Sequence, residues 1–231
     1  MKVLRGSGFL VLLVLFLSAG VSSGGNDAED HYTKGVEYAS EGNFIQARDE
    51  FKEALQVDPG DIRSKSSLKA IEDAIALKVK KEAVMHDFKG VVFDDKGMLD
   101  KGITEFTRAI EIDPEDAAAY ENRGSAYIDK GQYDRAISDL NKAIELDPKF
   151  AEAYYNRGNA YDDKGQYDRT ISDFTKAIEI EPQFTIAITK RGFVYMRKLG
   201  KKTMACKDWK RACELGSCEF YSNAKRKGDC R

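Results

Sequence analysis

Residues 117–150 read AAAYENRGSAYIDKGQYDRAISDLNKAIELDPKF, and residues 151–184 read AEAYYNRGNAYDDKGQYDRTISDFTKAIEIEPQF. The two stretches are identical at 24 of 34 positions, so they are two copies of one unit. The chain has four prolines, each after an acidic residue, and the last three are spaced by 34 residues: Pro59, Pro114, Pro148 and Pro182. A period of this length is typical of a solenoid, in which small helical or strand units stack on one another.

The first half of the unit predicts one helix. Tyr154, Gly158 and Tyr161 follow one another at i, i+4 and i+7, the spacing of one helical stripe. Gly165 is expected to end this helix, because glycine adopts left-handed backbone dihedrals without steric cost.

The second half of the unit predicts a facing helix. Thr170, Phe174 and Ala177 form its stripe, and the helix should stop before Pro182. The small residues let the two backbones approach, and the aromatic rings fill the remaining space. One such hairpin cannot bury its own apolar stripe, so each unit needs its neighbours.

The same positions recur in five units. The glycine of the first helix recurs as Gly35, Gly90, Gly124, Gly158 and Gly192, and the large residue of the second helix as Phe51, Phe106, Leu140, Phe174 and Trp209. This pattern resembles the tetratricopeptide repeat family. The resemblance implies an all-α fold, an α-solenoid of helix-turn-helix units that forms a right-handed superhelix.

The period divides the chain into eight segments. They are a signal peptide (1–23), a first repeat (28–61), an inserted helix (62–82), second, third and fourth repeats (83–116, 117–150 and 151–184), a degenerate fifth repeat (185–216) and a stapled capping helix (217–231). The insertion has two readings. Its helix, which is expected to run on toward Phe88, either covers the exposed end of the first repeat, which we favour, or acts as a rigid spacer of roughly 30 Å.

The N-terminal segment has the layout of a secretory signal peptide. Lys2 and Arg5 precede an apolar run from Phe9 to Leu17, and small residues follow. The run is too short to cross a bilayer as a helix, so no stable membrane insertion is expected after cleavage. An uncleaved membrane anchor is the alternative. We therefore expect a secreted protein, periplasmic if the source is bacterial.

Charge is divided unevenly along the chain. The net charge is only −2, which argues against a nucleic-acid binder. Residues 190–231 carry 13 basic and 4 acidic residues, whereas residues 24–189 carry 22 and 35. Part of this division is ordinary solvated helix surface. Alternatively, the basic end meets an acidic surface, either of a partner or of a second copy in a homo-oligomer.

All four cysteines lie in the last 26 residues, and an even number in an exported chain predicts two disulfides. Cys206 and Cys213 are about 10 Å apart along one helix, too far for a bridge. We predict Cys213–Cys218 and Cys206–Cys230; the crossed pairing, and free thiols or zinc, stay open. The segment RACELGSC (211–218) also resembles cysteine-bearing helix ends of secreted Sel1-like repeat proteins.

No enzymatic site is predicted. His31 and His86 occupy the stripe position of Tyr154, so packing explains them better than catalysis or metal binding. The sequence shows neither a nucleophile–base pair nor a glycine-rich phosphate loop. We therefore expect no catalytic residue, no cofactor and no metal.

The side of the first helices opposite the stripe is the predicted binding groove. In the tetratricopeptide family this side takes extended peptides or partner helices, and asparagines there hold the ligand backbone. Tyr155 is expected to supply an aromatic wall, and the acidic character suits a basic or polar segment. A plain solvated helix face is the alternative. The predicted groove residues are Asp87, Asp94, Asp95, Glu121, Asn122, Ser125, Asp129, Glu152, Tyr155, Asn156, Asn159, Asp162 and Asp163.

The predicted function is thus an exported, non-enzymatic scaffold that binds a protein or peptide segment in its concave groove. The alternative is a structural protein that self-assembles, with acidic grooves holding the basic C-terminal ends of other copies.

Overall fold

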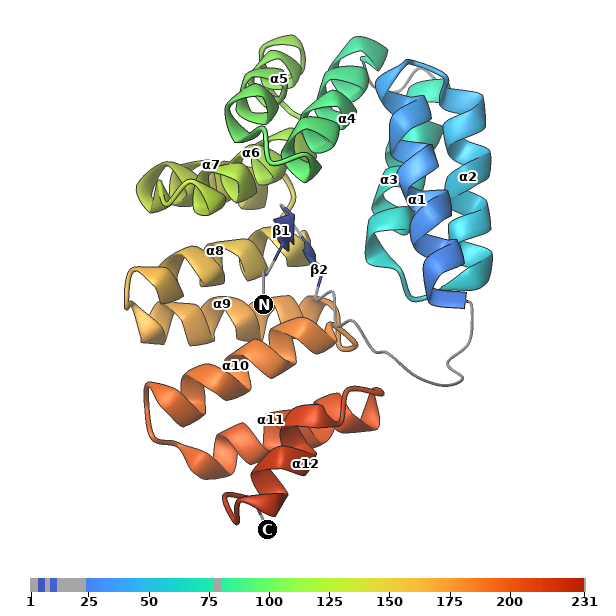
Figure 1. Ribbon diagram of the computed structural model, residues 1–231. Helices are drawn as coiled ribbons and strands as arrows, with labels where there is room; N and C mark the ends of the chain where they lie inside the picture. Colours follow the sequence, from blue (N-terminus) through green and yellow to red (C-terminus); the bar gives the residue numbers. More distant parts are fainter. Residues whose placement is uncertain (1–3, 7–8, 12–23, 77–79, 231) are drawn as a thin grey trace. The chain divides into compact units, whose positions relative to one another are not determined.

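The computed structural model describes residues 4–6, 9–11, 24–76 and 80–230 (Figure 1). Two short antiparallel strands, β1 (Leu4–Gly6) and β2 (Phe9–Val11), pair with Arg5 opposite Leu10. Every other regular element of the described residues is an α-helix, which confirms the all-α class. Apart from β1 and β2, the predicted signal peptide 1–23 lies outside the described residues.

The chain forms two compact lobes, Met1–Lys130 and Gly131–Arg231, called the N-terminal and C-terminal lobes below. The helices of the N-terminal lobe are α1 (Gly24–Ser40), α2 (Phe44–Val57), α3 (Ile62–Ile75), α4 (Lys81–Asp95), α5 (Leu99–Ile112) and α6 (Ala117–Asp129). Those of the C-terminal lobe are α7 (Tyr133–Leu146), α8 (Ala151–Asp163), α9 (Tyr167–Ile180), α10 (Thr185–Arg197), α11 (Lys202–Glu214) and α12 (Glu219–Arg226).

In four of the helical hairpins an aromatic ring of the second helix packs directly against a glycine of the first helix. A Cβ atom built on Gly158 would lie 2.7 Å from the ring of Phe174, and one on Gly192 would lie 2.6 Å from Trp209. Gly35 and Gly90 meet the rings of Phe51 and Phe106 in the same way. The predicted close approach of the two backbones is therefore confirmed. Gly165 has φ +72° just after α8, as its predicted role in ending that helix requires.

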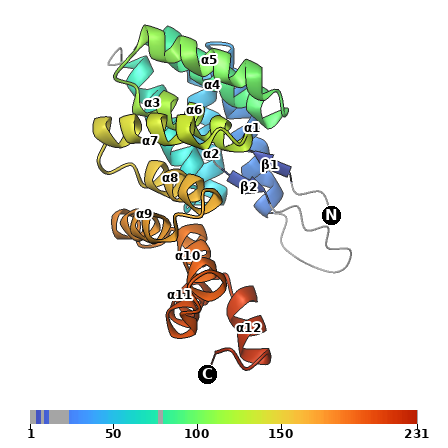
Figure 2. The ribbon, with the colours of Figure 1, turned by 90° about the vertical axis from the view of Figure 1, so that its left-hand side faces the viewer.

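Successive hairpins of the C-terminal lobe are joined by arginine forks. Arg157 of α8 donates from Nε and Nη2 to Asp173 of α9, at 2.8 and 2.7 Å, and from Nη1 to Asn141 of α7 at 2.8 Å. Each fork thus links one first helix to the second helices of its own repeat and of the preceding one. Bidentate pairs of this kind are among the strongest hydrogen-bonded ion pairs in proteins. Figure 2 shows α8 to α11 following one another as layers of this lobe.

The inserted helix α3 covers the first repeat. Ile71 of α3 is fully buried and belongs to the same core as Phe51 of α2. Phe88 of α4 stacks on Phe51, with ring centroids 5.9 Å apart, so α4 packs into that core as well. The covering role is therefore confirmed and the rigid spacer is wrong. Nor does the inserted helix run on toward Phe88, since α3 ends at Ile75 and α4 begins at Lys81.

Two disulfides close the C-terminal end. Cys206 pairs with Cys230, with Cα atoms 5.6 Å apart, and Cys213 pairs with Cys218, with Cα atoms 3.9 Å apart. This is the pairing that the sequence predicts. Cys230 is 5% exposed and packs in a small core with Trp209 of α11, so the chain end is folded back onto that helix.

Candidate functional site

The predicted groove residues lie on the first helices of the repeats, α4 and α6 in the N-terminal lobe and α8 in the C-terminal lobe. In the N-terminal lobe the structure brings two of them into contact. Asn122 Nδ2 of α6 donates to both carboxylate oxygens of Asp87 of α4, at 3.1 and 3.0 Å. The amide thereby fixes one carboxylate at the junction of two first helices.

The surroundings of Asp87 are acidic. Burial raises the pKa of Asp87 well above its usual value, and the negative charges of Asp116 and Glu121 raise it further, while the amide of Asn122 acts in the opposite direction. Asp116 caps α6 by accepting hydrogen bonds from the backbone N–H groups of Ala118 and Ala119. A carboxylate in such a field is stabilised by any cation that comes close. This part of the first-helix face therefore favours a basic group over an acidic one.

The other predicted residues of this lobe differ in accessibility. Asp94, Glu121 and Ser125 are buried, with 2%, 6% and 5% exposure, so their side chains belong to the helix packing. Asp95 is exposed and Asp129 is half-buried. Only the last two, with Asp87 and Asn122, are within reach of a ligand.

In the C-terminal lobe the predicted asparagines are neighbours on α8. Asn159 Nδ2 donates to Asn156 Oδ1 at 3.4 Å, and Asn156 is only 4% exposed, so Asn159 is the more accessible amide. Asp163 is exposed and Asp162 is half-buried. Burial raises the pKa of Asp162, whereas the positive charges of Lys190 and Lys198 lower it. Lys190 belongs to α10 and Lys198 directly follows that helix, so this lobe presents a face of mixed charge rather than a purely acidic one.

Tyr155 does not form an exposed aromatic wall, and this expectation is wrong. Its ring stacks on Phe174 of α9, with centroids 5.6 Å apart, and lies 5.2 Å from Phe184 at the start of α10. The side chain is 7% exposed. The second neighbour, Phe184, lies directly before the first helix of the next repeat, and a stripe drawn for one helical hairpin omits it.

Glu152 opens α8 beside two other acidic residues. Burial raises the pKa of Glu152 to about 7, and the charges of Glu181 and Asp147 add to the increase. Both neighbours end helices, α9 and α7 respectively. Glu152 is therefore a group of the C-terminal lobe that changes its charge near neutral pH.

The shift at Glu152 predicts a pH dependence of stability. A carboxyl whose pKa is higher in the folded than in the unfolded state binds its proton more tightly when folded. The free energy of unfolding should therefore be greatest below about pH 4.5 for this group and fall by roughly 3 kcal/mol as the pH rises to about 7. Urea unfolding followed by helical circular dichroism between pH 5 and 8 measures the slope.

Glu152→Gln should remove this slope and make the protein more stable than wild type at pH 8. Glu145→Gln changes an exposed carboxylate of α7 in the same lobe and should keep the wild-type slope. Identical slopes in wild type and Glu152→Gln would contradict the assignment.

The histidines bind carboxylates of their own hairpins. His31 Nδ1 lies 2.7 Å from Glu50, and His86 Nδ1 lies 2.6 Å from Glu105. Both contacts join a first helix to its second helix, as the stripe position of the histidines predicts. Among the residues that the structure describes, no group of three or more His, Cys, Asp or Glu residues is arranged to hold a metal ion. In the same part of the chain, none of the helices combines the length and apolarity needed to span a bilayer.

Arg63 is a polar residue of the first-helix side that sequence reasoning missed. It comes from α3 and donates to Glu29 of α1, with Nη2 2.6 Å from Oε2, and its guanidinium lies 4.4 Å from the ring centroid of Tyr32. The insertion interrupts the 34-residue period, so no register position pointed to this contact. The arginine forks, in contrast, could have been found, since Arg157 and Arg191 are 34 residues apart.

Comparison with known proteins agrees with this architecture. Models described as TPR repeat or tetratricopeptide repeat match residues 28–61, 85–116, 105–138, 124–165 and 151–184. Among curated proteins, none matches the chain significantly in sequence.

Solved structures share the fold. A crystal structure of MamA is 28% identical, with a TM-score of 0.53, and the match covers 79% of this chain and 94% of that one. MamA from Desulfovibrio magneticus RS-1 (residue 41 to the end) is 21% identical, with a TM-score of 0.53 and coverages of 85% and 99%. The first TPR of Spaghetti (RPAP3), bound to the HSP90 peptide SRMEEVD, is 25% identical, with a TM-score of 0.50 and coverages of 51% and 94%.

The matched repeats together span more than half of the chain, and their glycine–aromatic hairpins are those of the structure. The chain belongs to the tetratricopeptide repeat family.

Proposed function

We propose that this protein is an exported, non-enzymatic scaffold that binds a basic or polar segment of another protein on the first helices of its repeats. Its membership of the tetratricopeptide repeat family supports a protein-interaction scaffold. The similar RPAP3 domain is described as bound to a peptide, SRMEEVD, which carries two glutamates and one aspartate. The acidic surroundings of Asp87 favour the opposite ligand charge, so the two ligands should differ.

The observation that carries this proposal is the carboxylate of Asp87, held by Asn122 in a field of other acids. Folding places a charge there that Asp116 and Glu121 repel, and a ligand Lys or Arg would compensate it. The half-buried amide of Asn122 also remains able to hold Asp87 in place while the cation binds. A charge-assisted hydrogen bond of this kind contributes roughly 1.5–3 kcal/mol.

Asp87→Asn tests the face directly, because it removes the charge and keeps the shape. Binding of a labelled lysine-rich peptide, measured by fluorescence anisotropy, should weaken by about tenfold, or about 1.4 kcal/mol. Glu111→Gln is the matched control, since it removes one exposed carboxylate from the second helix α5 of the same repeat. Equal weakening in both variants would show a general charge effect and would contradict binding at Asp87.

The difference between the two variants should also appear with native partners: Asp87→Asn should capture less partner protein than Glu111→Gln. Captured proteins from an envelope extract are quantified by mass spectrometry, with Asp87→Asn compared against Glu111→Gln.

Export is tested separately. Protein isolated from the envelope fraction should begin just after one of residues 20–24. An intact N-terminus at Met1 would contradict export by a cleaved signal peptide.

Self-assembly is the second candidate, and the division of charge favours it. Residues 190–231 carry a net charge of +9 and residues 24–189 one of −13, so two copies can attract one another head to tail. Such an assembly should dissociate as salt screens the charges. Sedimentation velocity at about 20 mM and 500 mM salt decides this: a monomer at both salts and at every concentration would end this alternative.

A further inference from the structure

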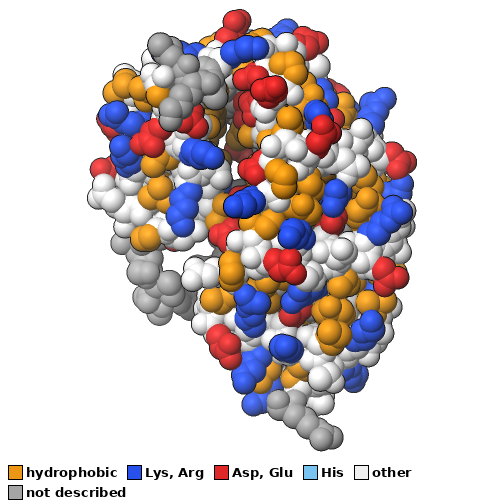
Figure 3. All heavy atoms as spheres, turned by 180° about the vertical axis from the view of Figure 1, so that it is seen from behind, with side chains coloured by type: hydrophobic (Ala, Val, Ile, Leu, Met, Phe, Trp, Pro, Cys, Tyr) orange, Lys and Arg blue, Asp and Glu red, His pale blue; other side chains and the backbone are white. Residues whose placement is uncertain are grey.

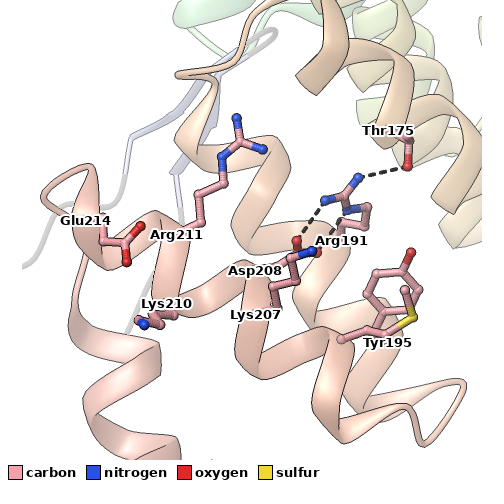
Figure 4. A pocket seen from close by; sticks show the side chains of 9 residues that line it. Thr175, Arg191, Tyr195, Lys207, Asp208, Lys210, Arg211 and Glu214 are labelled. Carbon is pink, nitrogen blue, oxygen red and sulfur yellow. Dashed lines mark hydrogen bonds and ion pairs between the residues drawn. The ribbon is translucent and has the colours of Figure 1, made fainter.

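The C-terminal lobe has a pocket that none of the predicted groove residues lines. The pocket has a volume of about 540 Å³ and lies between α9, α10 and α11 (Figure 4). Four of its lining side chains are basic and two are acidic: Arg191, Lys207, Lys210 and Arg211 against Asp208 and Glu214. Figure 3 shows basic side chains gathered toward the end of the lobe that holds α11 and α12.

Two of the four basic residues have structural roles. Arg191 donates from Nε and Nη2 to Asp208, at 2.9 and 2.7 Å, and from Nη1 to Thr175 at 2.9 Å. The charge of Asp208 is thereby neutralised inside the pocket wall. Arg211 Nη2 donates to the backbone carbonyl of Pro182 at 2.7 Å, which orients its guanidinium without a carboxylate partner.

The two lysines have no such role. Lys207 and Lys210 are exposed, and neither forms a hydrogen bond or an ion pair with any residue that the structure describes. They stand three residues apart on α11, where like charges weaken a helix by a few tenths of a kcal/mol. Neither lysine is neutralised by an ion pair with a described residue, and an anionic ligand would compensate their repulsion.

Comparison with the fourth repeat shows that both lysines replace uncharged residues. Aligned on the residue before each buried ring (Asp173 in the fourth repeat, Asp208 in the fifth), Lys207 corresponds to Ser172 and Lys210 to Thr175. The fork recurs, as Arg157 with Asp173 and Arg191 with Asp208. The fork therefore recurs between repeats, whereas a basic residue at the position of Lys207 occurs in none of the other four repeats; the position of Lys210 is also basic in the first repeat, as Lys52.

An apolar part completes the pocket. Met204, 47% exposed, and Tyr195, 8% exposed, line it beside the basic side chains. A flexible thioether next to positive charge suits a segment in which carboxylates flank an apolar side chain. Glu214 is the one acidic side chain of the lining outside the fork, and it lies at the opposite end from Tyr195 in Figure 4.

We propose that this pocket is a second binding surface, which takes an extended acidic segment of a partner protein through Lys207, Lys210 and Arg211. It is separate from the face at Asp87 and opposite to it in charge preference.

The probe is a fluorescein-labelled peptide EELDEE, with the uncharged peptide QQLNQQ as its counterpart. Wild-type protein should bind EELDEE and not QQLNQQ in anisotropy titrations, and binding should weaken with salt. Lys207→Glu with Lys210→Glu should weaken EELDEE binding at least about tenfold. Both side chains are exposed, so the melting temperature should stay close to that of wild type.

The control variant is Lys225→Glu with Lys227→Glu. It makes the same change of net charge on exposed residues of the same basic segment, outside the pocket. It should keep wild-type affinity for EELDEE within about threefold. Equal loss in the two double variants, or equal binding of QQLNQQ, would overturn the proposal.

Two further outcomes separate this proposal from the others. Asp87→Asn should leave EELDEE binding unchanged, so a failure of the first-helix face does not affect this test. If wild-type protein forms salt-sensitive oligomers that Lys207→Glu with Lys210→Glu dissociates, then a second copy occupies the pocket. That result would overturn a partner segment as the ligand.

Discussion

Phe174→Ala should lower the free energy of unfolding by about 3–5 kcal/mol, the loss expected when a large ring is removed from a packed interior. The ring is fully buried, lies against Gly158 and stacks on Tyr155. Tyr155 in turn contacts Phe184, so the row of rings joins α8, α9 and the start of α10. Urea unfolding followed by helical circular dichroism measures the loss, with Leu215→Ala, an exposed apolar residue of the same lobe, as the control.

The same contact can be tested by changing Gly158 instead of Phe174. Alanine is a better helix former than glycine by about 1 kcal/mol, so Gly158→Ala would stabilise an uncrowded helix. Here its Cβ would lie 2.7 Å from the enclosed ring of Phe174, and overpacking costs about 1–3 kcal/mol. Gly158→Ala should therefore destabilise wild type, yet be better tolerated in a Phe174→Leu background, where the smaller side chain leaves room. Strictly additive effects would contradict the contact.

The sequence period predicted the packing within each helical hairpin, because the same glycine and large apolar residue face each other in successive repeats. The sequence places Gly158 and Phe174 on facing stripes, and the structure brings them together. Distance along a helix ruled out a bridge between Cys206 and Cys213 but left the crossed pairing open, and the structure has the favoured pairing. These features depend on neighbours inside one repeat, or on adjacent helices at the chain end.

The binding face could be predicted less well, because its residues meet neighbours from other repeats. Tyr155 lies outside the stripe of its own hairpin, yet Phe184, directly before the first helix of the next repeat, covers it. Lys190 of α10 and Lys198, directly after that helix, change the charge beside Asp162 on α8. A helix in a stack has neighbours on more than one side, whereas a stripe describes only one of them.

The positive charge of the pocket lysines is present in the sequence, but no motif points to the place where it acts. Lys207 and Lys210 count toward the +9 charge of the C-terminal segment, which indicated an acidic partner without locating its site. Only the structure separates Arg191, whose charge is used by Asp208, from the two lysines that remain unused. Total charge and available charge are therefore different quantities in this segment.

The second large effect is expected at the chain end. Cys206→Ala with Cys230→Ala should destabilise the packing of α12 by roughly 3 kcal/mol, the chain-entropy value for a cross-link across 24 residues. Helix α12 has eight residues and is too short to persist without its contacts. The same variant also removes Cys230 from the core around Trp209, so its loss adds to the entropic effect. Hydrogen exchange of residues 219–226, measured by mass spectrometry, should become faster by about a hundredfold.

Cys213→Ser with Cys218→Ser is the matched comparison. This bridge spans only five residues and Cys218 is exposed, so the entropic loss should be smaller, roughly 2 kcal/mol, and local to the turn between α11 and α12. Reduction of the wild type should reproduce the Cys206/Cys230 variant, because the larger bridge dominates. If the five-residue bridge instead gave the greater loss of protection in α12, the turn rather than the folded-back chain end would hold the last helix in place.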